Sequence, residues 1–149
     1  MTFKETILQN YKQLVNDRID VFQDMIMALT EDSKNDAKGS AGDKHETTLS
    51  MMHLEQEKLN FKLKEILDQK QVLDKINPLQ KHSKIALGSV VKANTMHLFI
   101  SVALPKINVD SKTIIALSPQ SPLGLKLMGN VEGFSFDING TQFTIETVA

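Results

Sequence analysis

The sequence predicts an α+β fold in which an N-terminal helical hairpin is followed by a small β-sheet domain that carries one short helix. Composition changes abruptly along the chain, because all four prolines and five of the seven glycines follow residue 77. Residues 1–77 carry 11 basic and 14 acidic side chains, whereas residues 78–149 carry 6 and 4. We therefore predict two domains, 1–77 and 78–149.

Two long amphipathic helices are predicted in the first domain, because apolar side chains recur at spacings of three, four or seven. The predicted seam of the first helix is Ile7, Tyr11, Leu14, Arg18, Val21 and Met25, widened by Val15, Ile19, Phe22, Ile26 and Leu29. The predicted seam of the second helix is Met52, Leu59, Leu63, Ile66, Leu73 and Ile76. Glycines and helix-capping residues interrupt the pattern at about 31–48, which predicts an antiparallel coiled-coil hairpin with a polar tip.

Short strands are predicted in the second domain, where Val, Ile, Phe and Thr gather between turn residues. The predicted ranges are 85–91, 96–102, 113–117, 134–138 and 142–148. Asn139 and Gly140 should close the last pair as a tight hairpin. Ser121 should cap a short helix that has Pro122 at its first position and ends at Gly129. Its leucines and Met128 should cover the sheet.

Several classes of protein are disfavoured by composition. The chain has no cysteine, which excludes disulfides and thiolate metal sites. It has no secretory signal and no run of ~20 apolar residues, so we expect a soluble cytoplasmic protein with no membrane partner. The four histidines show no metal-ligand spacing, and we expect them to be solvated or structural. Catalytic motifs are absent from the sequence, so we expect no self-contained enzyme.

The predicted hairpin tip carries the sharpest candidate site, Asp43 and Glu46. Carboxylates three residues apart share one face of a helix, and here both would lie at the most projecting point of the hairpin. The structural alternative is a capping-box-like helix start, in which the helix dipole favours acidic side chains. Spacing alone favours this alternative.

Three lysines flank the tip and are candidates for contact with a nucleic-acid backbone: Lys34, Lys38 and Lys44. Asp32, Asp36 and Asp43 alternate with them and cancel most of their field. The net charge of the whole chain is -1, which also argues against broad electrostatic binding of nucleic acid. A solvated loop is the alternative.

The order of these parts resembles the Gre family of bacterial transcription factors, in which a coiled-coil hairpin with an acidic tip precedes a globular domain of FKBP-like fold. Two motifs carry the resemblance, which covers nearly the whole chain. Residues 42–46, GDKHE, match the family's G-D-x-x-E. Residues 116–133, ALSPQSPLGLKLMGNVEG, are similar to the family's S-P-L stretch, short helix and pair of glycines.

The resemblance implies that bacterial RNA polymerase is the partner and that this chain acts as a monomeric accessory factor, not as an enzyme. In the family the hairpin enters the secondary channel, so Asp43 and Glu46 would help to hold a second Mg²⁺ and position water for cleavage of backtracked RNA. Lysines near the tip would contact the 3′ end of the nascent RNA. Ser121, Pro122 and Leu123 would contact the polymerase. Hard oxygen ligands suit Mg²⁺.

Other functions stay open. Residues 47–50, TTLS, replace the polar and aromatic run that usually follows the acidic pair in the family, so a channel-binding regulator that does not cleave RNA is one alternative. A prolyl isomerase of FKBP-like fold is another, although the phenylalanines are better explained as core residues: Phe99, Phe134, Phe136 and Phe143. A coiled-coil module that binds an unrelated protein is the third.

Overall fold

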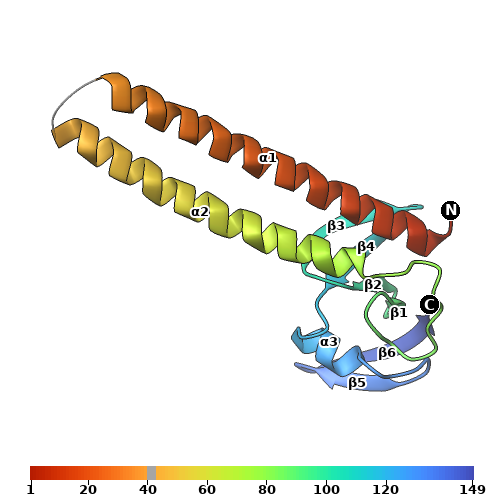
Figure 1. Cartoon of the computed structure of the whole chain (residues 1–149). Helices are drawn as coiled ribbons and strands as arrows, with labels where there is room; N and C mark the ends of the chain where they lie inside the picture. The colour runs from red at the N-terminus through yellow and green to blue at the C-terminus, as the bar shows by residue number, and fades with distance from the viewer. Residues whose placement is uncertain (40–42) are drawn as a thin grey trace. The chain divides into compact units, whose positions relative to one another are not determined.

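The computed structural model describes the backbone of residues 1–39 and 43–149 and the side chains of residues 1–34 and 46–149. It confirms the α+β class, since two helices precede a six-stranded mixed sheet and a short helix (Figure 1). The elements are α1 (Phe3–Gly39), α2 (Asp43–Asp74), β1 (Val90–Ala93), β2 (Met96–Ile100), β3 (Leu104–Val109), β4 (Lys112–Leu117), α3 (Pro122–Leu127), β5 (Ser135–Ile138) and β6 (Thr141–Val148). They form two compact units, residues 14–70 and residues 1–13 together with 71–149.

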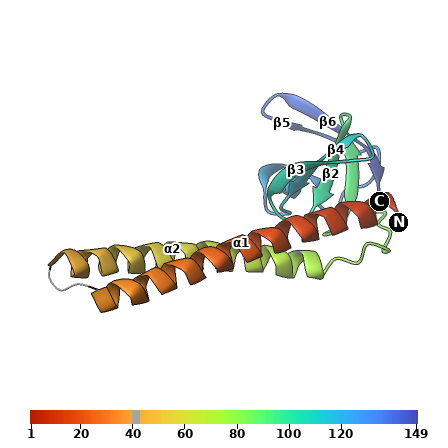
Figure 2. The same ribbon diagram turned by 90° about the horizontal axis from the view of Figure 1, so that it is seen from above.

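In the first of these units α1 and α2 lie side by side (Figure 1 and Figure 2). Two polar contacts fix their antiparallel pairing. The Gln56 amide donates a hydrogen bond to Thr30 Oγ1 at 2.9 Å, and the Ser33 hydroxyl donates to Met52 Sδ at 3.2 Å. Later residues of α1 therefore contact earlier residues of α2, as in an antiparallel pair.

The seam of α1 agrees with the prediction at Ile7 and Tyr11, which are fully buried, and differs from it farther along the helix. Val15 and Ile19 are buried, but Val21 and Met25 are 54% and 47% exposed. Adjacent rows of a helix can both show spacings of three and four, so periodicity alone does not choose between them. Burial of the row that contains Arg18 would desolvate a guanidinium group, which is costly. From Val15 onward, the row that was predicted to widen the seam is therefore the more buried one.

The seam of α2 agrees with the prediction up to Leu73, whereas Ile76 is buried but follows the end of the helix at Asp74. Leu59, Ile66 and Leu73 are buried, and Met52 and Leu63 are half-buried. Every one of these positions is separated from the next by seven residues or by three or four, as a continuous stripe on one helix face requires. In the described part of the chain, no helix combines the length and apolar character needed to span a membrane.

The sheet has the strand order β3-β4-β2-β1-β6-β5, in which β2 and β4 are parallel and the other neighbours antiparallel. Three of its hairpins close with two-residue turns in which both residues have positive φ: Asn94 and Thr95, Asp110 and Ser111, and Asn139 and Gly140. These are turns of the type I′ class, whose twist matches that of the strands. The turn predicted at Asn139 and Gly140 is confirmed.

Two strand predictions are wrong. The range 85–91 becomes strand only from Val90, because residues 86–89 form a turn in which Gly88 has φ +91°. A Cβ on Gly88 would lie 2.8 Å from Ile76 Cγ2, so this turn also needs glycine for space. Strand β3 was not predicted. It contains Pro105 at a shift in its pairing with β4, which an edge strand tolerates.

Both faces of the central strands are covered. Side chains on one face pack around Leu127 of α3, in a cluster of Ile85, Val91, Ala93, Leu98, Ile100, Leu117, Leu127 and Ile145. On the other face, Phe99 is fully buried against Tyr11 of α1. Phe99 is thus a core residue as predicted, whereas Phe134 is 43% exposed and is not. Phe136 and Phe143 are half-buried and stack on one another.

Candidate functional site

The candidate carboxylates lie at the start of α2, which begins at Asp43. Glu46 is exposed in the first turn of this helix, where the helix dipole favours a negative charge. The side chain of Asp43 lies outside the described residues. An α-helix places residues i and i+3 on one face, so the backbone is compatible with the predicted pairing of the two positions.

In residues 1–34 and 46–149, no group of three or more His, Asp or Glu side chains is gathered closely enough to hold a metal ion. Glu46 supplies a hard carboxylate donor of the kind that Mg²⁺ accepts, and Asp43 would supply a second. Mg²⁺ takes six ligands in near-octahedral geometry and usually keeps several waters, so two carboxylates would fill only part of its coordination shell.

Of the three candidate lysines, Lys34 is exposed and lines an open cavity of 240 Å³ on α1. Glu31 shares this cavity, and Asp32 is exposed beside it in the sequence. Lys34 therefore stands in a local field of mixed sign, as its sequence neighbours predict. Lys38 and Lys44 lie outside the described side chains.

The predicted helix cap at Ser121 is confirmed. Ser121 has extended backbone angles, φ -65° and ψ 159°, and its hydroxyl accepts a hydrogen bond from the Gly124 N–H at 3.0 Å. The same hydroxyl donates to the Ser118 carbonyl at 2.7 Å. Pro122 follows at the first helical position, where its missing N–H costs nothing. Ser121 is thus engaged within the fold, which leaves Pro122 exposed and Leu123 half-buried on the core.

Gly124 is required by close packing. A Cβ built on it would lie 2.1 Å from the Ser118 carbonyl oxygen and 2.9 Å from Ser121 Oγ. The run S-P-L-G therefore specifies how the chain passes from β4 into α3. Leu127 is fully buried, but Leu125 is 67% exposed and Met128 36% exposed. The prediction that the whole apolar run covers the sheet is corrected, because α3 presents part of it outward.

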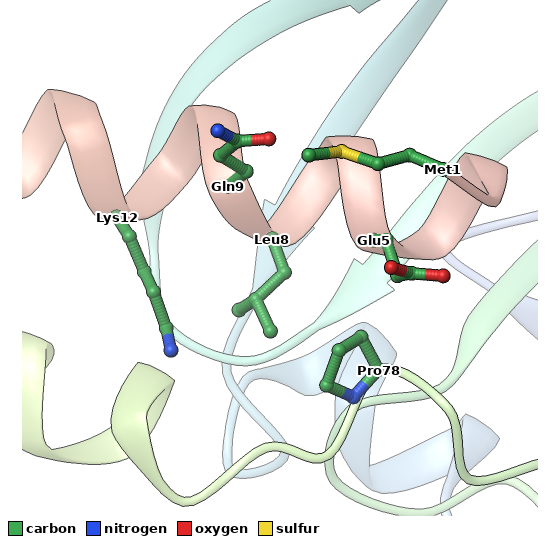
Figure 3. Close-up of a pocket in the computed structure, with 6 residues that line it drawn as sticks. All are labelled: Met1, Glu5, Leu8, Gln9, Lys12 and Pro78. Carbon is green, nitrogen blue, oxygen red and sulfur yellow. The ribbon is translucent and has the colours of Figure 1, made fainter.

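A cavity of 230 Å³ lies between the first turns of α1 and Pro78 (Figure 3). Figure 3 shows Leu8 and Pro78 pointing toward one another, with Glu5 beside Pro78 and Lys12 farther along the helix. The Lys12 ammonium pairs with Asp74 at 3.8 Å. This cavity is open and mostly apolar. None of the residues that line it is a nucleophile with an adjacent base.

A buried polar network joins α1 to the segment that leads into the sheet. The Lys4 ammonium donates to the Gln80 carbonyl at 2.8 Å and lies 3.4 Å from His82 Nδ1. His82 Nδ1 is also 2.9 Å from the Ser89 hydroxyl. Burial lowers the pKa of Lys4, and burial followed by the charge of Lys4 lowers the pKa of His82. Ser89 is fully buried, so the network is structural.

Sequence reasoning missed this network. Lys4 and His82 lie 78 positions apart in the sequence, and neither belongs to a motif. Comparison with known proteins adds no further constraint: neither a protein-family model nor a curated protein sequence matches this chain. The functional assignment therefore depends on the residues of this chain alone.

Proposed function

We propose that this chain is a Gre-like accessory factor of bacterial RNA polymerase, which stimulates cleavage of backtracked nascent RNA by bringing Asp43 and Glu46 to the polymerase active centre. The observation that carries this proposal is the position of Glu46. Its carboxylate is exposed in the first turn of a 32-residue helix, roughly 40 Å from the other end of that helix at ~1.5 Å per residue. A long two-helix arm with an acidic tip suits delivery into a narrow channel.

Electrostatics explains why two carboxylates suit this task. When bound, a second Mg²⁺ would stabilise the attacking and leaving oxygens of an in-line displacement. Asp43 and Glu46 would hold it together with ligands from the polymerase, because two carboxylates leave most of its coordination positions open. Lys34, Lys38 and Lys44 would contact the 3′ end of the nascent RNA, weakly because acidic neighbours surround them.

The sheet unit would dock on the polymerase through the start of α3. Pro122 and Leu125 are exposed there beside the half-buried Leu123, so they offer apolar surface on a segment that Ser121 and Gly124 hold rigidly. We also propose that this unit has an FKBP-like fold. The mixed six-stranded sheet with one short helix supports that assignment.

A transcript-cleavage assay on backtracked polymerase complexes tests the proposal. The wild-type chain should accelerate shortening of the RNA, and Asp43→Asn or Glu46→Gln should slow it at least about tenfold, as loss of a group that supports a metal typically does. Glu57→Gln is the matched control, because Glu57 is also exposed on α2 but lies three turns away. Equal rates for the wild type and both tip variants would overturn the cleavage function.

A second candidate is a regulator that occupies the channel without cleavage, which residues 47–50, TTLS, favour because they lack the family's polar and aromatic side chains. Competition for polymerase with a known secondary-channel factor separates the two. Displacement without cleavage would assign the regulator. Failure to bind polymerase at all would leave the coiled coil as an interaction module for another protein.

A further inference from the structure

The sheet unit carries a second cluster of polar and cationic side chains that the proposed function does not use. Lys92 on β1 is the cross-strand partner of His97 on β2. Strands β2 and β4 are parallel neighbours, so the turns that precede them lie at the same end of the sheet. Lys112 begins β4 at this end, and Lys106 lies on the neighbouring β3. Four strands thus bring basic groups together.

Two cavities open at this end of the sheet. The first has a volume of 460 Å³ and is lined by Thr95, Met96, His97, Lys106, Ser111, Lys112, Thr113 and Ile115. The second has a volume of 270 Å³ and is lined by Phe3, Val90, Lys92, His97, Lys112, Thr147 and Ala149. His97 and Lys112 line both cavities, so the two adjoin. The first offers hydroxyl, ammonium and imidazole groups together.

Over the side chains that the structure describes, none of the ammonium groups of Lys92, Lys106 and Lys112 has a carboxylate within salt-bridge distance. Lys112 instead lies over the ring of Phe3, with Nζ 5.0 Å from the ring centroid. The same ring meets His97 edge-on at 5.9 Å. The aromatic ring orients the Lys112 ammonium without neutralising its charge.

The charged groups that act on His97 are also mostly positive. Burial, then Lys112, then Lys92 lower the pKa of His97, and the nearby Glu146 opposes them only in part. One oxygen of Glu146 already accepts a hydrogen bond from the Thr95 N–H at 3.3 Å. Asp110 adjoins the cluster in sequence but does not line either cavity. At His97 the charges of Lys112 and Lys92 thus outweigh that of Glu146.

We propose that the first cavity binds a phosphate group, supplied by a nucleotide or by a nucleic-acid strand. Phosphate oxygens accept hydrogen bonds from ammonium groups and hydroxyls, and Lys106, Lys112 and Ser111 present both kinds of donor around one open space. A carboxylate would use fewer of these donors because it has two oxygens instead of three or four. This inference is independent of the cleavage function, since it uses no residue of the hairpin tip.

Isothermal titration calorimetry with pyrophosphate tests the site, at fixed ionic strength. The double variant Lys106→Ala/Lys112→Ala should weaken binding at least about tenfold, as the loss of charged hydrogen bonds does. Lys126→Ala is the control for charge alone, because Lys126 is exposed on α3 and lines neither cavity. Ser111→Ala keeps every charge and should weaken binding about threefold through the lost hydroxyl. Far-ultraviolet circular dichroism checks that the variants fold.

A parallel titration with a short single-stranded RNA that has hydroxyl ends distinguishes the two sources. Tighter binding of pyrophosphate assigns a small phosphorylated ligand, and tighter binding of the RNA assigns a nucleic-acid strand. Both results support the site if the double variant reduces binding and Lys126→Ala does not. Absence of binding to either probe would overturn the proposal, as would an equal effect of Lys126→Ala.

Discussion

The phenol ring of Tyr11 on α1 stacks on the phenyl ring of Phe99 on β2, with ring centroids 5.9 Å apart and planes inclined by 6°. Both side chains are fully buried. The Tyr11 hydroxyl donates a hydrogen bond to the Pro105 carbonyl on β3 at 2.9 Å. This one side chain therefore fastens the first turns of α1 to two strands of the same unit.

Removal of this ring should destabilise the protein strongly. Tyr11→Ala should lower the free energy of unfolding by about 4 kcal/mol, because it empties a large buried site. Tyr11→Phe should lower it by about 1 kcal/mol through the lost hydrogen bond. Urea denaturation measures both. The matched control is Phe61→Ala, whose ring is 66% exposed on α2 and whose effect should stay within about 0.5 kcal/mol. A Tyr11→Ala effect as small as that of Phe61→Ala would contradict the packing role.

The hydroxyl of Tyr11 gives a second test. Burial raises the pKa of Tyr11 to about 12 from the usual value of 10.0. Stability from the neutral phenol is thus fully present below pH 10.0 and is lost as the pH rises through about 12. Tyr11 is the only tyrosine of the chain, and there is no tryptophan, so tyrosinate absorbance reports this group alone. After a rapid pH jump, before the protein unfolds, Tyr11 should ionise with a midpoint near pH 12. A midpoint near 10.0 in the folded protein would refute the burial effect.

Acid should weaken the network of Lys4, His82 and Ser89. The pKa of His82 is lowered from 6.5 in the folded protein, so stability is fully present above pH 6.5 and is lost as the pH falls through the folded pKa. His97 contributes with the same sign, because its pKa is lowered too. Urea denaturation at several pH values measures the slope. His82→Asn should reduce this slope. An unchanged slope in His82→Asn would rule out this contribution.

The features that sequence reasoning found are those whose chemistry is local. Ser121 caps α3 through the N–H three residues later, and Asn139 with Gly140 closes a turn by its own backbone preference. The turn at Asp110 and Ser111 escaped detection, because neither residue is glycine although both have positive φ. Strand β3 was missed with it.

Features that depend on the alignment of distant segments could not be predicted. Lys92 and His97 face each other only because β1 and β2 pair in one register, and Lys112 joins them only because β4 runs parallel to β2. The buried row on α1 is a different case. Val15 and Val21 are both apolar, but Arg18 lies in the row of Val21, and the cost of burying its charge already weighs against that row.

Substitution of Gly124 should destabilise the turn into α3. Gly124→Ala would place a Cβ 2.1 Å from the Ser118 carbonyl oxygen, a backbone atom that cannot move without disturbing β4. We expect a loss of at least about 2 kcal/mol in the free energy of unfolding. Gly129→Ala is the control, since nothing lies within 4 Å of its Cβ and only its φ of +79° is unfavourable. That strain costs about 1 kcal/mol. Urea denaturation should show a larger loss for Gly124→Ala than for Gly129→Ala. A larger loss for Gly129→Ala would contradict the steric explanation.

If the sheet unit docks on RNA polymerase through α3, Leu125 should separate binding from stability. Its side chain is 67% exposed, so Leu125→Glu should change the free energy of unfolding by less than about 0.5 kcal/mol. In the proposed interface the same change would desolvate a carboxylate against apolar surface, and the Kd for polymerase should rise at least about tenfold. Leu79→Glu is a matched control in the same unit, because Leu79 is 69% exposed but lies outside α3. Equal Kd values for both variants and the wild type would place the docking surface elsewhere on the molecule, whereas a loss confined to Leu125→Glu would assign it to α3.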